Sequence, residues 1–333
     1  MSTNFNVNNS FNNFFDDFFN GAMNVRFGGR MRFLAVALAS IAAVGVVLPM
    51  ASGNSDRLLS APVLQAGQKF VYRVRYKTQK VTRSENRIAT PLVPEKRDSD
   101  IERYVAVEVQ NVQGAGNKIR TVMRTQLLPT DGSSRSADEG VVEFTLLADG
   151  RADGLRGFNV LSADEQAIWR QWITQFALGW TFPAKGVRLK EKWKKEEPVV
   201  GAALARLEWE KQLEYVRDEA CPATGDGDSD GRSTVANSAG QCAVVVTTST
   251  MKQQGSHDDT TPEDYKLHQL KTSGAAKGRT DVLTFISLKT GFLERANEDS
   301  AQTLDVLVAK ADDSNRTHLN VDATSHAEVV LVH

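Results

Sequence analysis

The chain has 333 residues and a formal net charge of −1, and 24% of its residues are charged. This near-neutral composition excludes the strongly basic surface that is typical of nucleic-acid-binding proteins. A chain of this length can bury a large hydrophobic core, either in one large β domain or in two small domains.

The first 53 residues differ in composition from the rest of the chain. Residues 1–32 contain an Asn- and Phe-rich low-complexity run followed by a basic segment. An apolar segment and a site of small residues follow within 33–53, an order that predicts a cleaved secretory signal. The apolar run 33–50, about 18 residues long, also fits an uncleaved single-pass anchor. In that case this run is the part of the chain that contacts a membrane.

Residues 54–68 have the composition of a linker, and residues 69–333 are expected to form one β-rich domain. In 69–78, aromatic and aliphatic side chains alternate with basic ones, as in an antiparallel strand with one buried face. A hairpin is expected between 101–112 and 118–128. Further strands are expected over 141–147, 187–193, 242–252, 264–272, 279–288, 292–300, 302–310 and 317–332.

Residues 201–219 fit two structures. Their Ala-, Leu- and Glu-rich composition favours a helix, whereas the alternation of apolar and polar residues from Leu207 to Tyr215 favours a strand. We expect a strand, because Cys221 and Cys242 would then join the base of a hairpin with 242–252.

The chain has two cysteines, Cys221 and Cys242, which enclose the low-complexity loop 222–241. An even pair in an exported chain predicts a disulfide. Two free thiols are the alternative. The bond would close a flexible loop of about 20 residues.

Residues 162–178 form the one convincing amphipathic helix after the N-terminal segment. Ser162 and Glu165 make a capping box, and Gly179 is positioned for a left-handed C-terminal cap. One face carries the apolar residues Ile168, Trp169, Trp172, Ile173 and Phe176. Because so short a helix is unstable alone in water, this face must pack on something else.

These elements predict a mainly β fold: a curved antiparallel sheet or half-barrel of about ten strands, with one amphipathic helix packed on its concave face. Trp169, Trp172 and Phe176 are then expected to fill the core. If the sheet does not close over them, they would instead line a pocket for an apolar ligand such as a lipid.

Asp226, Asp228 and Asp230, followed by Gly231, match the first half of a calcium-binding loop. The twelfth position is Asn237 instead of a bidentate Glu. A solvated acidic loop is therefore the alternative to a metal site.

Catalytic signatures are absent from the sequence. It has no G-x-S-x-G elbow, and no glycine-rich phosphate loop follows a strand, so no cofactor is expected. Carboxylates are plentiful, but no spacing selects an acid–base pair. A hydrolase whose two carboxylates come from distant strands stays open as an alternative.

Three short sequence words occur in order along residues 64–310: Gly67 to Tyr72 (G-Q-x-F-x-Y), Val187 to Trp193 (V-x-x-G-x-x-W, with Lys190 or Glu191 where the glycine would stand) and Lys289 to Gly291 (K-T-G). This order resembles uncharacterised β-rich exported bacterial families of unknown function. Strands wrapped on a Trp-rich helix also resemble lipoprotein-carrier half-barrels, which is an analogy of fold alone.

We therefore expect a non-catalytic exported module, periplasmic or extracellular, that binds an apolar ligand or another envelope component. The alternatives are an extracytoplasmic hydrolase and a structural or adhesive surface protein anchored through residues 33–50.

Overall fold

The computed structural model describes residues 58–332 except 87–93, 115–117, 132–135, 137, 200–201, 223–239 and 255–259. The predicted secretory signal or anchor and the acidic motif of Asp226, Asp228 and Asp230 lie outside the described residues. The described part of the predicted linker packs against the domain, since Leu59 and Leu64 are buried and Leu59 pairs with Val187 through two backbone hydrogen bonds.

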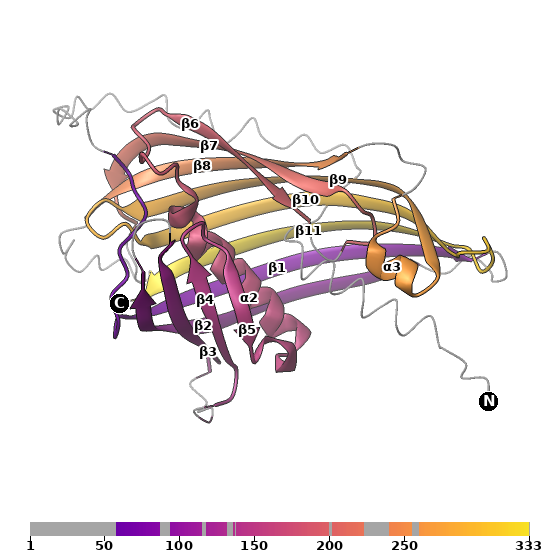
Figure 1. The fold of residues 1–333 in the computed structure, drawn as a ribbon, viewed down its shortest axis with the longest axis horizontal. Coiled ribbons are helices and arrows are strands. Elements are labelled where there is room, and N and C mark those ends of the chain that lie inside the picture. Colours follow the sequence, from indigo (N-terminus) through magenta and orange to yellow (C-terminus); the bar gives the residue numbers. More distant parts are fainter. Residues whose placement is uncertain are drawn as a thin grey trace, which may run out of the picture.

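Eleven antiparallel strands form one curved, unclosed sheet in the order β5-β4-β3-β2-β1-β11-β10-β9-β8-β7-β6 (Figure 1). Their bounds are β1 Lys69–Asn86, β2 Glu95–Gln113, β3 Arg120–Leu128, β4 Val141–Leu147, β5 Ala152–Arg156, β6 Lys192–Pro198, β7 Leu207–Ala220, β8 Gln241–Gln253, β9 Leu270–Ser287, β10 Leu293–Lys310 and β11 Thr317–Val332. Neighbours in the sheet are neighbours in sequence except at one position, where the first strand pairs with the last. The predicted mainly β half-barrel is confirmed.

The alternation in β1 determines which side chains face the concave side of the sheet. Tyr72 and Val74 are buried there, whereas Arg73 and Arg75 point to the convex face. On that face, Arg75 binds Asp100 of β2 at 2.9 Å and Arg73 lies 3.5 Å from Glu328 of β11. The basic row of β1 is thus neutralised by acidic side chains on both neighbouring strands.

Within the segment 201–219, residues 207–219 form a strand, as expected, since they belong to β7, which pairs with β8. The prediction was wrong for 264–272, which contains the short helix α3 (Glu263–Leu267) before β9 begins. Pro262 caps this helix, and Glu263 and Asp264 lie in its first turn, where acidic residues favour a helix.

Two further boundaries differ from the predicted ones. The segments 292–300 and 302–310 were expected as separate strands, but both lie on one long strand, β10, and β9 runs from the last residues of 264–272 through most of 279–288. The expected strand 187–193 begins only at Lys192. Lys190 just before it adopts a left-handed backbone with φ 68°, which is the conformation that the glycine of the V-x-x-G-x-x-W word would favour.

The amphipathic helix α2 spans Ala163–Phe176, and both hydrogen bonds of the Ser162–Glu165 capping box are present. The prediction of a left-handed cap at Gly179 is wrong. The chain continues instead into the 3₁₀ helix η4 (Ala177–Thr181), where Gly179 leaves room for Pro62. Among the described residues, no helix combines the length and apolar character needed to cross a bilayer.

The helix lies on the concave face of the sheet, which curves around it (Figure 1). Its aromatic face packs into the larger hydrophobic cluster with residues of β1–β4, β10 and β11. A second cluster lies at the other end of the long strands, under α3. The concave face therefore carries apolar regions at both ends of the long strands.

The predicted disulfide is present between Cys221 and Cys242, and it joins the end of β7 to the start of β8. The two half-cystines are 21 positions apart in the sequence. The bond packs with Val244 and Phe285 on the convex side of the sheet.

We expect the double variant Cys221→Ser/Cys242→Ser to lose about 2–3 kcal/mol of unfolding free energy, because the open loop gains conformational entropy in the unfolded state. Urea denaturation with and without a reducing agent measures this. The reductant should destabilise the wild-type protein by the same amount and leave the double variant unchanged. A wild-type stability that does not respond to full reduction would contradict the prediction.

Candidate functional site

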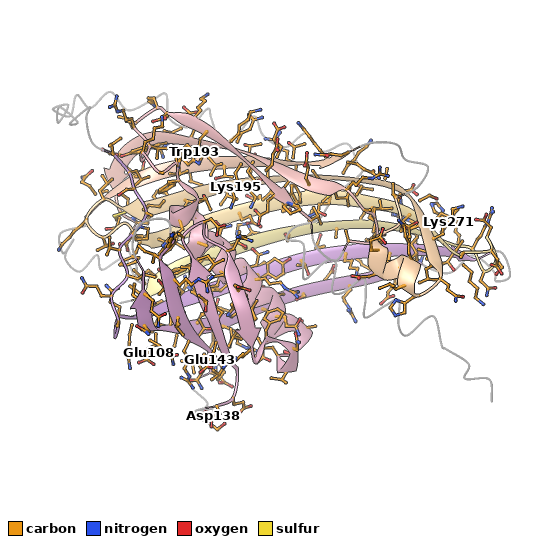
Figure 2. All side chains as sticks on the ribbon, in the orientation of Figure 1. Glu108, Asp138, Glu143, Trp193, Lys195 and Lys271 are labelled. Atoms are coloured by element: carbon orange, nitrogen blue, oxygen red, sulfur yellow. A yellow bond between two sulfur atoms is a disulfide. The ribbon has the colours of Figure 1, made fainter. Side chains whose placement is uncertain are left out.

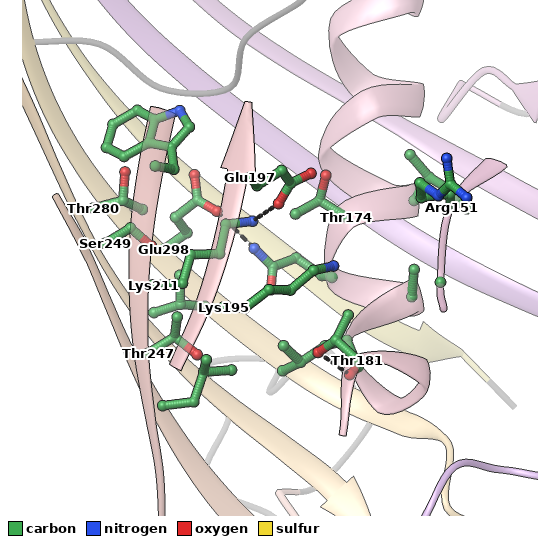
Figure 3. A pocket seen from close by; sticks show the side chains of 18 of the residues that line it. Arg151, Thr174, Thr181, Lys195, Glu197, Lys211, Thr247, Ser249, Thr280 and Glu298 are labelled. Carbon is green, nitrogen blue, oxygen red and sulfur yellow. Dashed lines mark hydrogen bonds and ion pairs between the residues drawn. The ribbon is translucent and has the colours of Figure 1, made fainter. Parts of the chain in front are cut away.

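A cavity of about 340 Å³ lies between α2 and the concave face of β6–β10. One wall is the side of the helix opposite its aromatic face, from Ile173 to Thr181. The other wall comes from β6 and from side chains of β7–β10 (Figure 3). Trp193 and Lys195 belong to β6, the edge strand on this side of the sheet (Figure 2).

A row of polar side chains crosses the concave face from the edge strand inward. Consecutive Cα partners place them side by side on seven strands: Lys195, Lys211, Ser249, Thr280, Ser300, Ser325 and Thr78. We call these seven residues the polar row. It runs between the two hydrophobic clusters, and its first four members line the cavity.

The four hydroxyl members of the polar row on β8 to β11 are buried, although they lie where a purely structural core would be apolar. Ser249 and Thr280 are each 4% exposed, and the hydroxyls of Thr280 and Ser300 lie 3.2 Å apart. Next to the row, Thr247 also lines the cavity, is 5% exposed and has no hydrogen-bond partner for Oγ1 among the described residues. A buried hydroxyl without a partner costs about 1–3 kcal/mol.

A buried carboxylate forms part of the cavity floor. Glu298 is 2% exposed, and its Oε2 accepts a hydrogen bond of 2.6 Å from Nε2 of Gln175. Burial raises the pKa of Tyr76, close by on β1, to about 12, and the charge of Glu298 acts in the same direction. The Tyr76 hydroxyl also interacts with Gln171 and Ser325. Polar residues of α2 are thus tied to the sheet through a buried network.

Two lysines oppose one another where the cavity meets the sheet edge. Lys195 of β6 and Lys211 of β7 are direct cross-strand partners and point to the same face. Lys211 binds Glu197 at 2.5 Å, whereas Lys195 makes no hydrogen bond or ion pair within the described part of the chain. Figure 3 shows Lys195 lying along the cavity between β6 and α2.

The charges of Lys195, Lys211 and Glu197 influence each other. Burial lowers the pKa of Lys195. The charge of Glu197 opposes this shift, and the charge of Lys211 adds to it. Burial alone would raise the pKa of Glu197, but the charge and hydrogen bond of Lys211 outweigh it, so that this pKa is lowered. Lys211 therefore favours the ionised form of the Glu197 carboxylate.

Arg151 of the β4–β5 turn is exposed and lies at the mouth of the cavity. Its guanidinium binds Asp149 at 2.7 Å. The lining thus combines charged and hydroxyl side chains with the apolar side chains of Ile173, Leu178 and Leu213. This arrangement suits a ligand with one polar and one apolar end.

The structure brings the three aromatic residues predicted for ligand binding together, but on the other side of the helix. Trp169, Trp172 and Phe176 are 3%, 0% and 2% exposed, and none of them lines the cavity. Their ligand-binding role stays a prediction. Sequence reasoning missed the cavity residues, and the signal that pointed to them was the placement of Thr174 and Gln175 outside the apolar face of α2.

No protein-family model matches the chain, and no curated protein is significantly similar to it. The outer membrane protein OprG from Pseudomonas aeruginosa aligns with 9% identity and a TM-score of 0.21, over 83% of this chain and 100% of that one. An outer membrane channel from Pseudomonas putida F1 aligns with 10% identity and a TM-score of 0.17, over 81% and 97%. At such TM-scores neither likeness establishes a shared fold or function.

Proposed function

We propose that this protein is a non-catalytic, exported binding module whose cavity under α2 receives a small amphiphilic molecule with an acyl-type chain. The observation that carries the proposal is the cavity itself, which lies between the helix and the sheet and is lined by both apolar and polar side chains. Its volume of about 340 Å³ is at the lower end of ligand pockets, which span roughly 300–1,000 Å³.

Export is part of this proposal. The disulfide Cys221–Cys242 supports it, because such bonds persist in oxidising compartments and are rare in the cytosol. The periplasm and the extracellular space are both compatible with it. Recovery of a processed chain beginning near residue 54 from either compartment would support the proposal.

A catalytic function has one observation in its favour, since Glu197 and Glu298 line the same cavity. Hydrolases of glycosidic bonds use two carboxylates, one of them as an acid and the other as a base or nucleophile. Here Glu197 is neutralised by Lys211, and Glu298 is held at the floor by Gln175. Because both carboxylates already have structural partners, binding explains the site better than hydrolysis does.

The binding proposal predicts that delipidated protein takes up medium-chain acyl ligands. Offered monolauroylglycerol, laurate and a lauroyl lysophospholipid, it should change its tryptophan fluorescence, because Trp209 lines the cavity. A ligand present at about 100 times its Kd should also stabilise the fold by about 2.7 kcal/mol. Both changes are measured in titrations and thermal unfolding experiments.

A cavity-filling variant locates the binding. Thr174 is half-buried on α2 and lines the cavity, so Thr174→Trp should abolish uptake. Ala163→Trp adds the same side chain at an exposed position of the same helix and should bind as the wild type does. The proposal fails if no acyl ligand binds, or if the wild-type protein hydrolyses aryl glycosides and Glu298→Gln abolishes that activity.

A further inference from the structure

We propose that the cavity selects ligands with an anionic head group, a carboxylate or phosphate on an acyl chain, and that Lys195 recognises this group. The inference rests on the proposed binding function and adds the chemical class of the ligand. It is carried by the placement of Lys195 and Lys211, by the charge balance of the cavity and by buried donors beside them.

The two lysines are placed against each other at a cost to the fold. Directly opposed like charges on neighbouring strands destabilise a sheet, and Lys195 and Lys211 are such a pair. Other lysines of β6 avoid this arrangement: Lys192 and Lys194 lie on the exposed convex side and bind Glu214 and Glu210. An anion bound in the cavity between them would offset this repulsion.

Three cations and two carboxylates line the cavity, and one of the carboxylates, Glu298, is held on its floor by Gln175. Glu197 neutralises Lys211, and Asp149, which does not line the cavity, neutralises Arg151. Lys195 is half-buried and has neither a hydrogen bond nor an ion pair among the described residues. A charge interacts more strongly in such a low-dielectric site than in water, so an anion bound there would offset the desolvation of the lysine.

Donors beside the lysines complete the site. The Thr247 hydroxyl is buried at the cavity without a partner, and Ser249 follows Lys211 in the polar row. An ionised carboxylate or phosphate offers only acceptors, and charge-assisted hydrogen bonds to it are about twice as strong as neutral ones. The apolar side chains of α2 and η4 then contact the chain of the ligand.

Matched ligands of one chain length test the inference on the disulfide-bonded protein. We expect laurate and dodecyl phosphate to bind at least tenfold more tightly than neutral monolauroylglycerol. Lys195→Gln should abolish this preference, whereas Lys195→Arg should restore most of it. Lys192→Gln removes the same charge from the convex face of β6 and should retain the preference.

Each result has one reading. If anionic and neutral ligands bind with equal affinity to the wild-type protein, or the preference survives in Lys195→Gln, the inference is wrong and the proposed function stands. If neither class binds, the proposed function fails, and the inference fails with it. If inorganic phosphate binds as tightly as dodecyl phosphate, the site recognises free phosphate and the acyl-chain ligand is excluded. Thermal unfolding of each variant confirms that the fold is intact.

Discussion

Trp172→Ala is expected to lower the free energy of unfolding by about 3–5 kcal/mol, the range for a buried aromatic truncated to alanine. The Trp172 side chain is 0% exposed. Its ring stacks on Phe176 with centroids 5.0 Å apart and meets Phe144 of β4 at 6.2 Å. The variant therefore removes the side chain that joins α2 to the sheet and leaves a cavity in the larger cluster.

Denaturant unfolding followed by circular dichroism measures this loss. Trp172→Phe keeps an aromatic ring in the site and should cost clearly less than the alanine variant. Val160→Ala changes a residue that is 87% exposed and should stay within about 0.5 kcal/mol of the wild type. A loss below about 1 kcal/mol for Trp172→Ala would show that α2 does not anchor the core.

The local features of the fold could be predicted from sequence because their signals are short-range. The Ser162–Glu165 capping box lies within four consecutive residues, and both of its hydrogen bonds form as expected. The strand 141–147 was predicted with the bounds of β4. In each case the residues that determine the structure are also close neighbours in the chain.

The polar side of α2 shows where such reasoning stops. On an ordinary surface helix, Gln171 and Gln175 would face water, but here they are 2% and 4% exposed. The sheet curves around the helix, so side chains outside the aromatic face are also enclosed. They are buried because they contact Glu298 and Tyr76, which lie on strands more than 90 residues away in sequence.

The lysine pair depends on strand register, which no local pattern reveals. The expected strand 187–193 ended before Lys195, and the sequence gives no sign that β6 pairs with β7 so that Lys195 opposes Lys211. The polar row needs five further pairings of this kind to be correct at once. Its members are therefore invisible as a group until the sheet is assembled.

Gly274→Ala is expected to cost at least about 3 kcal/mol, because it combines a strained backbone with a backbone clash. Gly274 of β9 has φ 148°, which residues with side chains rarely adopt, and a Cβ there would lie 2.1 Å from the carbonyl oxygen of Asp305. This oxygen belongs to the backbone of β10, so it can move only if the pairing of the two strands changes.

Gly67→Ala separates the two effects. Gly67 also has a positive φ, 85°, but a Cβ would meet nothing within 4 Å, so only the backbone strain of about 1–2 kcal/mol should appear. Denaturant unfolding of both variants compares them. Equal losses would mean that β9 and β10 can separate at no cost. A larger loss for Gly274→Ala means that the two strands must stay in close contact for the second hydrophobic cluster to remain packed beneath α3.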